Sequence, residues 1–225
     1  MNRLAIAIPC RDAISADAFP HIARSILECG ILWQKTYGSE ADVAIYVVAR
    51  AHVAEARNEI ALQCIKDNCD WILWMDDDAV PPPAILGKLL ASGKEFIAPI
   101  FFMKNPPYLP TCFEWDLPEP PPRTYNGMLK GRRCQLDPPR LFRADATGFH
   151  TVLMSGRVLK RVQEILPEGQ HVFTRTGQNS GEDITFCYWA WKAGLDLWID
   201  SRIEVGHVGT RVITKDDFLR EQSVV

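Results

Sequence analysis

Three consecutive aspartates, Asp76, Asp77 and Asp78, end an apolar run in the stretch DWILWMDDDAVPPP at residues 70–83. Adjacent carboxylates disfavour one another's ionisation unless a cation lies among them. Such oxygen ligands suit Mg²⁺ or Mn²⁺, which typically bind one or two carboxylates together with substrate phosphates. A Walker B strand also ends in Asp, but the segment ASGKEF at residues 91–96 lacks the earlier Gly and the Ser or Thr of a Walker A loop. The remaining alternative is a solvated acidic turn, and the apolar run favours the cation site.

A second acidic pair, Glu182 and Asp183, opens the stretch GEDITFCYWAWKAG at residues 181–194. Ser180 and Asp183 have the spacing of a capping box, and acidic residues are favoured in a first helical turn. The chemical alternative is that one of the two carboxylates, held at a helix N-terminus beside a cleft, is a general base. From the spacing alone, the helix-capping role is better supported than the role of general base.

A third motif is VGHVG at residues 205–209, which places His207 between glycines. Imidazole is a ligand of first-row metals such as Mn²⁺. Glycine on both sides permits a close approach of the backbone to a bound diphosphate. The usual alternative for a lone histidine is a hydrogen-bonded side chain in a turn.

The apolar periodicity predicts alternating strands and helices that position these motifs. Strands are expected at 3–9, 41–49, 71–75 and 95–102, and helices at 18–30, 52–68 and 83–93. We expect Gly30 to close the first helix. The order βαβαβαβ implies a mostly parallel sheet with right-handed crossovers. The aspartates then lie at the carboxyl end of a strand, where open α/β sheets bind ligands.

The second half of the chain is expected to be less regular at first. Residues 104–145 form a proline-rich, irregular excursion that is long enough to be a functional loop or lid. A strand at 146–155, helices at 156–166 and 180–194, and a strand at 195–200 follow. The tail from about residue 208 is expected to be flexible, and we expect a single domain over residues 1–225.

Composition limits the class of protein. The 225 residues are 47% hydrophobic, enough for one sizeable core, and the net charge of −3 argues against a protein held mainly by nucleic-acid phosphates. The seven cysteines contain no CxxC pair, so free thiols in a reducing compartment are expected. No apolar stretch is long enough to span a bilayer. We therefore expect a cytoplasmic protein without a membrane span.

In their order along the chain, the motifs resemble those of metal-dependent glycosyltransferases of the GT-A fold, in particular glycosyltransferase family 2. The segment ILWMDDDA resembles the DxD motif, GEDITFCYWAWKAGLDLWID the Glu-Asp helix with its following strand, and VGHVG the late metal-binding histidine. The segment VAEARNEIALQCI is similar to the one that often precedes the DxD strand. The resemblance covers roughly residues 3–210. It implies a GT-A (Rossmann-like) three-layer α/β/α sandwich with a mostly parallel central sheet.

The resemblance also implies a binding role for particular side chains. The metal, Mn²⁺ or Mg²⁺, would be held by Asp78, Asp76 and His207. Asp76 would approach the ribose of the nucleotide, with Asp77 assisting. The residues expected against the nucleotide are Pro9, Arg11, Arg57, Asn58, Asp76, Asp77 and Arg211, the last from a closing tail.

The implied reaction moves a single sugar from a nucleotide-diphosphate sugar to an acceptor hydroxyl, with inversion. Asp183 would be the catalytic base and Glu182 the second candidate. A UDP-sugar is the favoured donor, although no aspartate directly follows the second strand, where many relatives contact the uracil. The Gln-x-x-Arg-Trp motif of processive synthases is absent, which favours single transfer. The acceptor stays open between a saccharide, a protein, a lipid and a modified nucleic acid, and the sequence does not give the oligomeric state.

Two other functions remain. A sugar nucleotidyltransferase shares the metal aspartates, but it usually carries a glycine-rich loop after the first strand, and IPCRDAISADAF at residues 8–19 has no glycine. A catalytically silent nucleotide- or carbohydrate-binding module would keep the fold without needing the full set of acidic residues and histidine.

Overall fold

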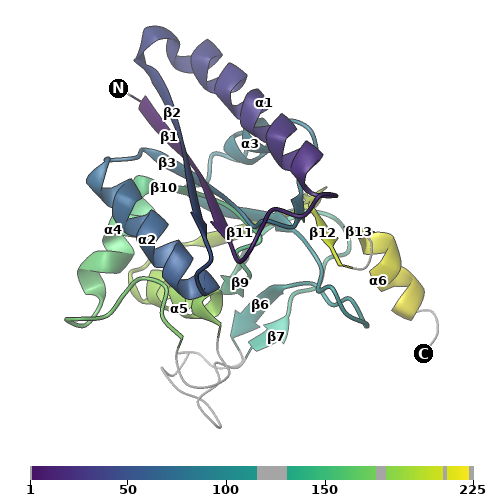
Figure 1. Cartoon of the computed structure of the whole chain (residues 1–225). Coiled ribbons are helices and arrows are strands. Elements are labelled where there is room, and N and C mark those ends of the chain that lie inside the picture. Colours follow the sequence, from purple (N-terminus) through teal and green to yellow (C-terminus); the bar gives the residue numbers. More distant parts are fainter. Residues whose placement is uncertain (1, 116–130, 176–180, 210–211, 223–225) are drawn as a thin grey trace.

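The centre of the protein is a seven-stranded sheet in the order β2-β1-β3-β10-β5-β11-β8 (Figure 1). The computed structural model describes residues 2–115, 131–175, 181–209 and 212–222. The strands are β1 (Asn2–Cys10), β2 (Ala41–Ala49), β3 (Trp71–Met75), β5 (Phe96–Ile100), β8 (Leu141–Ala144), β10 (Thr151–Ser155) and β11 (Leu197–Glu204). β10 is antiparallel to β3 and β5, β8 is antiparallel to β11, and the other neighbouring pairs are parallel. The mostly parallel sheet predicted from the sequence is confirmed.

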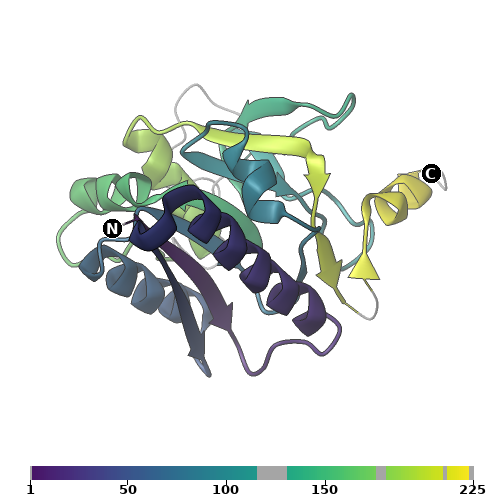
Figure 2. The ribbon, with the colours of Figure 1, turned by 90° about the horizontal axis from the view of Figure 1, so that it is seen from above.

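Helices cover both faces of this sheet, so the architecture is the predicted three-layer α/β/α sandwich (Figure 2). One face is covered by α1 (Phe19–Tyr37) and α3 (Ile85–Leu90). The other face is covered by α2 (Val53–Lys66), α4 (Gly156–Ile165) and α5 (Glu182–Lys192).

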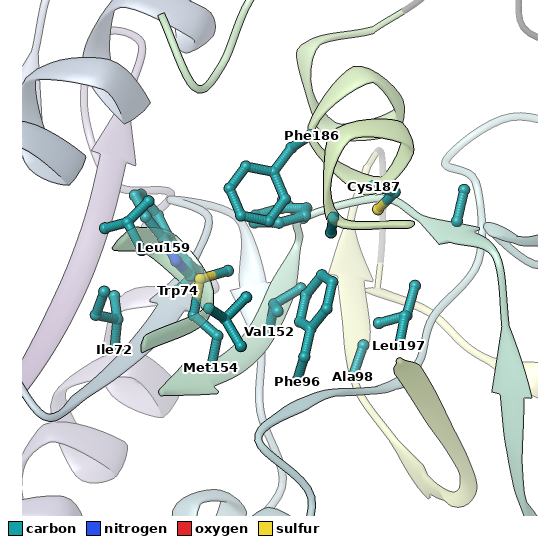
Figure 3. Close-up of a cluster of buried hydrophobic side chains, with 14 of the residues drawn as sticks. Ile72, Trp74, Phe96, Ala98, Val152, Met154, Leu159, Phe186, Cys187 and Leu197 are labelled. Carbon is teal, nitrogen blue, oxygen red and sulfur yellow. The ribbon is translucent and has the colours of Figure 1, made fainter. Parts of the chain in front are cut away.

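Strand β3 is apolar along its whole length because both of its faces are buried. Ile72 and Trp74 belong to the core beneath α2, α4 and α5, together with Phe186 of α5 (Figure 3). Leu73 and Met75 point to the opposite face and pack in the core beneath α1 and α3. Side chains alternate between faces along a strand, so a strand between two helical layers needs an unbroken apolar run. This run fixes the position of the three aspartates at its end.

Two small sheets lie beside the main one. The first joins β4 (Ala79–Val80), β12 (Gly206–Val208) and β13 (Val212–Ile213), and it pairs His207 with Ala79. The second joins β6 (Cys112–Trp115), β7 (Gly131–Arg133) and β9 (Ala146–Thr147), and it pairs Phe113 with Arg133. The first sheet therefore places the late histidine next to the aspartates.

Several boundaries differ from the sequence expectation. α1 does not end at Gly30 but continues to Tyr37, because Trp33 is 1% exposed and packs on Tyr37 with ring centroids 4.7 Å apart. Burial of that side chain offsets the cost of about 1 kcal/mol of a glycine inside a helix. α5 begins at Glu182 with Gly181 as its N-cap rather than at Ser180, which lies outside the described residues.

The two segments expected to be irregular contain regular elements. The proline-rich excursion contributes β6, β7 and β8, the last of which forms an edge of the main sheet. The tail contains β13 and α6 (Lys215–Gln222), whose Phe218 ring stacks on Phe102 at 5.6 Å. Short strands and a polar helix of this kind have weak apolar periodicity, so their positions depend on contacts with distant parts of the chain.

All seven cysteines are buried and none is in a disulfide. In the described ranges, no helix combines the length and the apolar character needed to cross a bilayer.

Candidate functional site

The candidate site lies where β3 ends and two other strands approach it. The amide of Asp76 donates a hydrogen bond of 2.9 Å to the carbonyl of His150, which directly precedes the antiparallel strand β10. The amide of Val208 in β12 donates to the carbonyl of Asp78 at 3.0 Å. Backbone pairing therefore brings two histidines from distant parts of the chain to the aspartates.

These side chains form a cluster with the geometry of a metal site, which we call the metal cluster: Asp78, His150 and His207. Each offers one ligand atom, and these atoms all lie within 4.8 Å of one another. Oδ1 of Asp78 lies 3.4 Å from Nδ1 of His150 and 3.5 Å from Nε2 of His207. One carboxylate and two imidazoles form a suitable partial shell for a first-row divalent ion.

The far nitrogen of each imidazole is held by a backbone carbonyl. Nδ1 of His207 lies 2.9 Å from the carbonyl oxygen of Phe102, and Nε2 of His150 lies 3.0 Å from that of Gly206. A carbonyl only accepts hydrogen bonds, so these nitrogens carry protons and the opposite nitrogens face Asp78. Nδ1 of His150 is buried and has no hydrogen-bond partner in the described part of the chain. Carbonyls commonly orient metal-binding histidines in this way, so the residues fit a divalent cation.

The charges of the metal cluster are strongly coupled. Burial alone would lower the pKa of His150, but the carboxylates of Asp76 and Asp78 outweigh it and raise that pKa to about 9. Burial would likewise raise the pKa of Asp78, but His150 and His207 hold it far below its usual range. Lys104 forms an ion pair with Oδ2 of Asp78. The positive charges of His150 and Lys104 thus offset the negative charges of the carboxylates at the place where a metal ion would bind.

The other two aspartates have different partners. Oδ1 of Asp76 lies 2.7 Å from a guanidinium nitrogen of Arg57. Oδ2 of Asp77 accepts a hydrogen bond of 3.0 Å from the backbone amide of Arg11, and the carbonyl of Asp77 accepts one from Ser15. Asp77 therefore fixes the loop after β1, and Asp78 is the member of the triplet that meets both histidines.

Arg57 joins the aspartate triplet to the acidic pair at the start of α5. Its second terminal nitrogen forms an ion pair with Glu182, and the two side chains are only 3% and 5% exposed. The guanidinium carbon also lies 5.7 Å from the ring centroid of Phe149. Because Glu182 is used in this buried pair, the adjacent Asp183 is the carboxylate available to a ligand.

We expect Arg57→Met to lower the free energy of unfolding by about 3–5 kcal/mol, because it leaves two carboxylates without their buried partner. Denaturant unfolding at pH 7 measures the change. Arg161→Met is the matched control: its ion pair with Glu164 is 53% and 62% exposed, so the loss should be below about 1 kcal/mol. Equal losses in the two variants would contradict the buried bridge.

Asp183 lines a cavity of about 480 Å³ together with His150 and His207. Its Oδ1 accepts a hydrogen bond of 2.7 Å from the amide of Ile184. Burial, followed by the charge of Glu182, raises the pKa of Asp183 to about 6. A carboxylate with a pKa near 6 is ionised at neutral pH yet takes up a proton more readily than an ordinary aspartate, as a general base requires.

Two glycines leave space around this carboxylate. A Cβ added to Gly181 would lie 2.3 Å from Oδ1 of Asp183, and one added to Gly148 would lie 3.5 Å from Oδ2 and 3.1 Å from Phe101. A larger side chain at position 181 would displace Asp183, and one at position 148 would crowd Phe101 in the cavity.

A smaller cavity of about 230 Å³ adjoins the first one. It is lined by the end of β1, the aspartate triplet and the start of α2, including Pro9, Arg11 and Val53. Lys104 and His207 line both cavities. The metal cluster thus lies between a small pocket at the end of β1 and the larger cavity that contains Asp183.

The remaining residues expected at the site have other surroundings. The side-chain amide of Asn58 makes two hydrogen bonds to the backbone of Phe173, of 2.6 and 2.8 Å, and so fixes that segment. Arg211 lies outside the described residues. Sequence reasoning missed His150 and Lys104. The sequence placed His150 inside the expected strand at 146–155, whereas β10 begins after it at Thr151, and Lys104 lay in the proline-rich excursion.

Comparison with known proteins agrees with this architecture. The model of the Anp1 family, which is glycosyltransferase-like, matches residues 35–112, a stretch that includes the aspartate triplet. Protein A197 from STIV superposes with a TM-score of 0.58 at 14% identity, covering 96% of this chain and 92% of that one. GalNAc-T7, solved with UDP, GalNAc and Mn²⁺, superposes with a TM-score of 0.52 at 12% identity over 92% of this chain. The chain has a GT-A-like glycosyltransferase fold.

The extent of these similarities limits what they show. This chain spans 43% of the GalNAc-T7 chain, and no curated protein sequence matches it. The similarities therefore establish the GT-A-like fold.

Proposed function

We propose that this protein is a metal-dependent glycosyltransferase that moves a single sugar from a nucleotide-diphosphate sugar to an acceptor hydroxyl. The observation that carries the proposal is that both histidines of the metal cluster line one cavity with Asp183. Breaking the bond between a sugar and a diphosphate builds negative charge on the leaving group, and a separate base must activate the acceptor. A silent binding module would need only the first of these two features.

The donor is proposed to lie across both cavities. The nucleotide side would occupy the small pocket beside Pro9 and Arg11, and the sugar would lie in the larger cavity beside Asp183. Lys104 and His207 line both cavities, so the diphosphate would lie at their boundary, against the metal cluster. A UDP-sugar stays the favoured donor, in line with the resemblance of the motifs.

The residues that would hold the divalent ion are Asp78, His150 and His207, in place of the set expected from the sequence, which had Asp76 as its third member. When bound, the ion supplies Lewis-acid stabilisation of the leaving diphosphate. Two imidazole ligands favour Mn²⁺ over Mg²⁺, because Mg²⁺ prefers oxygen ligands.

Asp183 is proposed as the base that removes the proton of the acceptor hydroxyl, with attack opposite the leaving group and inversion at the anomeric carbon. Its carboxylate lines the cavity and is raised in pKa by burial, whereas Glu182 is held by Arg57. The seven buried free thiols favour a reducing compartment, so the proposal includes a cytoplasmic location.

The test is the release of nucleoside diphosphate from UDP-, GDP- and dTDP-linked sugars, measured with Mn²⁺, with Mg²⁺ and with a chelator. We expect turnover of one donor with Mn²⁺, weaker turnover with Mg²⁺ and none with chelator. Asp78→Asn should abolish turnover at metal concentrations that saturate the wild type, because it removes the carboxylate shared by both histidines. Asp196→Asn, at a half-exposed surface position, is the control.

Metal-independent turnover would contradict the metal-dependent mechanism. Metal-dependent binding of a nucleotide sugar without any cleavage, with a panel of acceptors present, would instead support the binding module.

A further inference from the structure

Arg133 is a cation fixed on the wall of the larger cavity by neutral partners. It lies in β7 directly opposite Phe113 of β6, and its guanidinium carbon is 4.9 Å from the centroid of that ring. One terminal nitrogen donates a hydrogen bond to the carbonyl of Pro110, and the other lies 3.2 Å from Sδ of Met103. The orientation of the guanidinium is thus set before any ligand binds.

No carboxylate of the described residues forms an ion pair with Arg133, in contrast to Arg57 on the same cavity, which has two such partners. Burial lowers the pKa of Arg133, but a guanidinium keeps its charge in proteins. Among the described residues, Pro110 and Met103 use two of its five N–H groups. An anion from outside the chain would form charge-assisted hydrogen bonds with a half-buried guanidinium of this kind.

The residues that line the cavity indicate which molecule would carry this anion. Arg133, Phe113 and Asp183 line the same cavity of about 480 Å³ as the two histidines of the metal cluster. Under the proposed function, on which this inference rests, both the transferred sugar and the acceptor hydroxyl must reach Asp183. A group bound at Arg133 therefore belongs to one of the two reacting molecules.

We propose that Arg133 binds a carboxylate carried by a sugar ring, as in a uronic acid, in the cavity that contains Asp183. The planar guanidinium matches a planar carboxylate through parallel N–H···O bonds. The partly buried ring of Phe113, which lines the same cavity, suits the apolar face of a sugar ring. The carboxylate has two possible sources, the donor sugar and the acceptor saccharide.

Matched ligands that differ only in this carboxylate separate the two sources. Both arms use calorimetric titration with Mn²⁺ present. The donor arm compares UDP-glucuronic acid with UDP-glucose. The acceptor arm compares methyl β-glucuronoside with methyl β-glucoside in the presence of UDP. A charge-assisted hydrogen bond predicts that the wild type prefers the carboxylated member of one pair by about tenfold or more. Arg133→Met should lose this preference, and Arg133→Lys should keep part of it. The affinity for UDP alone should stay unchanged in both variants, because the nucleotide pocket does not contain Arg133.

A preference in the donor arm assigns the carboxylate to the transferred sugar, and one in the acceptor arm assigns it to the acceptor. Equal affinities within both pairs, or a preference that persists in Arg133→Met, would overturn the inference. The glycoside arm is also run without UDP, because it then requires neither turnover nor nucleotide binding. A chain that binds no nucleotide but prefers the glucuronoside through Arg133 would refute the proposed function while retaining the carboxylate site.

Discussion

Asp183→Asn is expected to lower kcat for sugar transfer by about 10²–10⁴-fold without weakening the fold. The amide keeps the shape of the side chain and its Oδ1 still accepts the hydrogen bond from the amide of Ile184, but it cannot take up a proton from the acceptor. The KM for the donor should change little, because the metal cluster is untouched. Steady-state kinetics with saturating Mn²⁺ separate the two constants.

The pH profile gives a second test of the base. Because burial raises the pKa of Asp183 to about 6, the wild-type kcat/KM should rise as pH increases through 6 and level off near pH 7. The residual activity of Asp183→Asn should lack this rise. Full activity in the variant, or an unchanged rise through pH 6, would assign the base to another residue.

Stability should change in the direction opposite to activity. The folded pKa of Asp183 lies above the ordinary value near 3.9, so the folded state binds more protons than the unfolded state between about pH 4 and 6. The contribution of Asp183 to the stability of the wild type therefore falls as pH rises through this window. Asp183→Asn removes that dependence, and we expect it to be about 1–3 kcal/mol more stable than the wild type at pH 8 but equally stable at pH 4. Denaturant unfolding at the two pH values measures the difference.

The fold and part of the site were predictable because they depend on local patterns. The apolar run from Trp71 to Met75 predicts a strand buried on two faces, and the aspartates directly after it must then lie at the carboxyl edge of the sheet. The glycines around His207 indicated a close approach of backbone. The structure places β12 against β4, which brings this histidine beside Asp78.

The rest of the site depends on pairings between distant segments, which no local pattern encodes. His150 meets Asp78 only because β10 inserts antiparallel between β3 and β5, and the sequence predicted a mostly parallel sheet without indicating which strand is antiparallel. Arg57 and Glu182 are separated by 125 positions, so their buried ion pair could not be read from spacing. The proposed nucleotide contact of Arg57 therefore competes with a structural role that the sequence did not reveal.

Loss of His150 distinguishes the two possible sets of metal ligands. The structure favours His150 as the third ligand beside Asp78 and His207, whereas the sequence motif implied Asp76. His150→Ala should weaken Mn²⁺ binding by at least about 100-fold, because removing even an outer partner of a metal ligand costs about 10–100-fold. Asp76→Asn is the matched control: its Oδ1 is bonded to Arg57 and its Oδ2 lies 3.9 Å from His150, so affinity should stay within about tenfold. Calorimetric titration with Mn²⁺ measures both variants.

Proton release provides the decisive check on this ligand. The carboxylates of Asp76 and Asp78 overcome the effect of burial and raise the pKa of His150 to about 9, so at pH 7 the metal-free imidazole is protonated. Mn²⁺ requires the neutral ring, and its binding must therefore release this proton, with an affinity that rises about tenfold per pH unit up to about pH 9. Titrations in two buffers of different ionisation enthalpy count the protons released. His150→Ala should release fewer protons and show a flatter pH dependence. If it instead kept the wild-type proton count while Asp76→Asn lost both proton release and Mn²⁺ affinity, the third ligand would be Asp76, as the sequence motif implied.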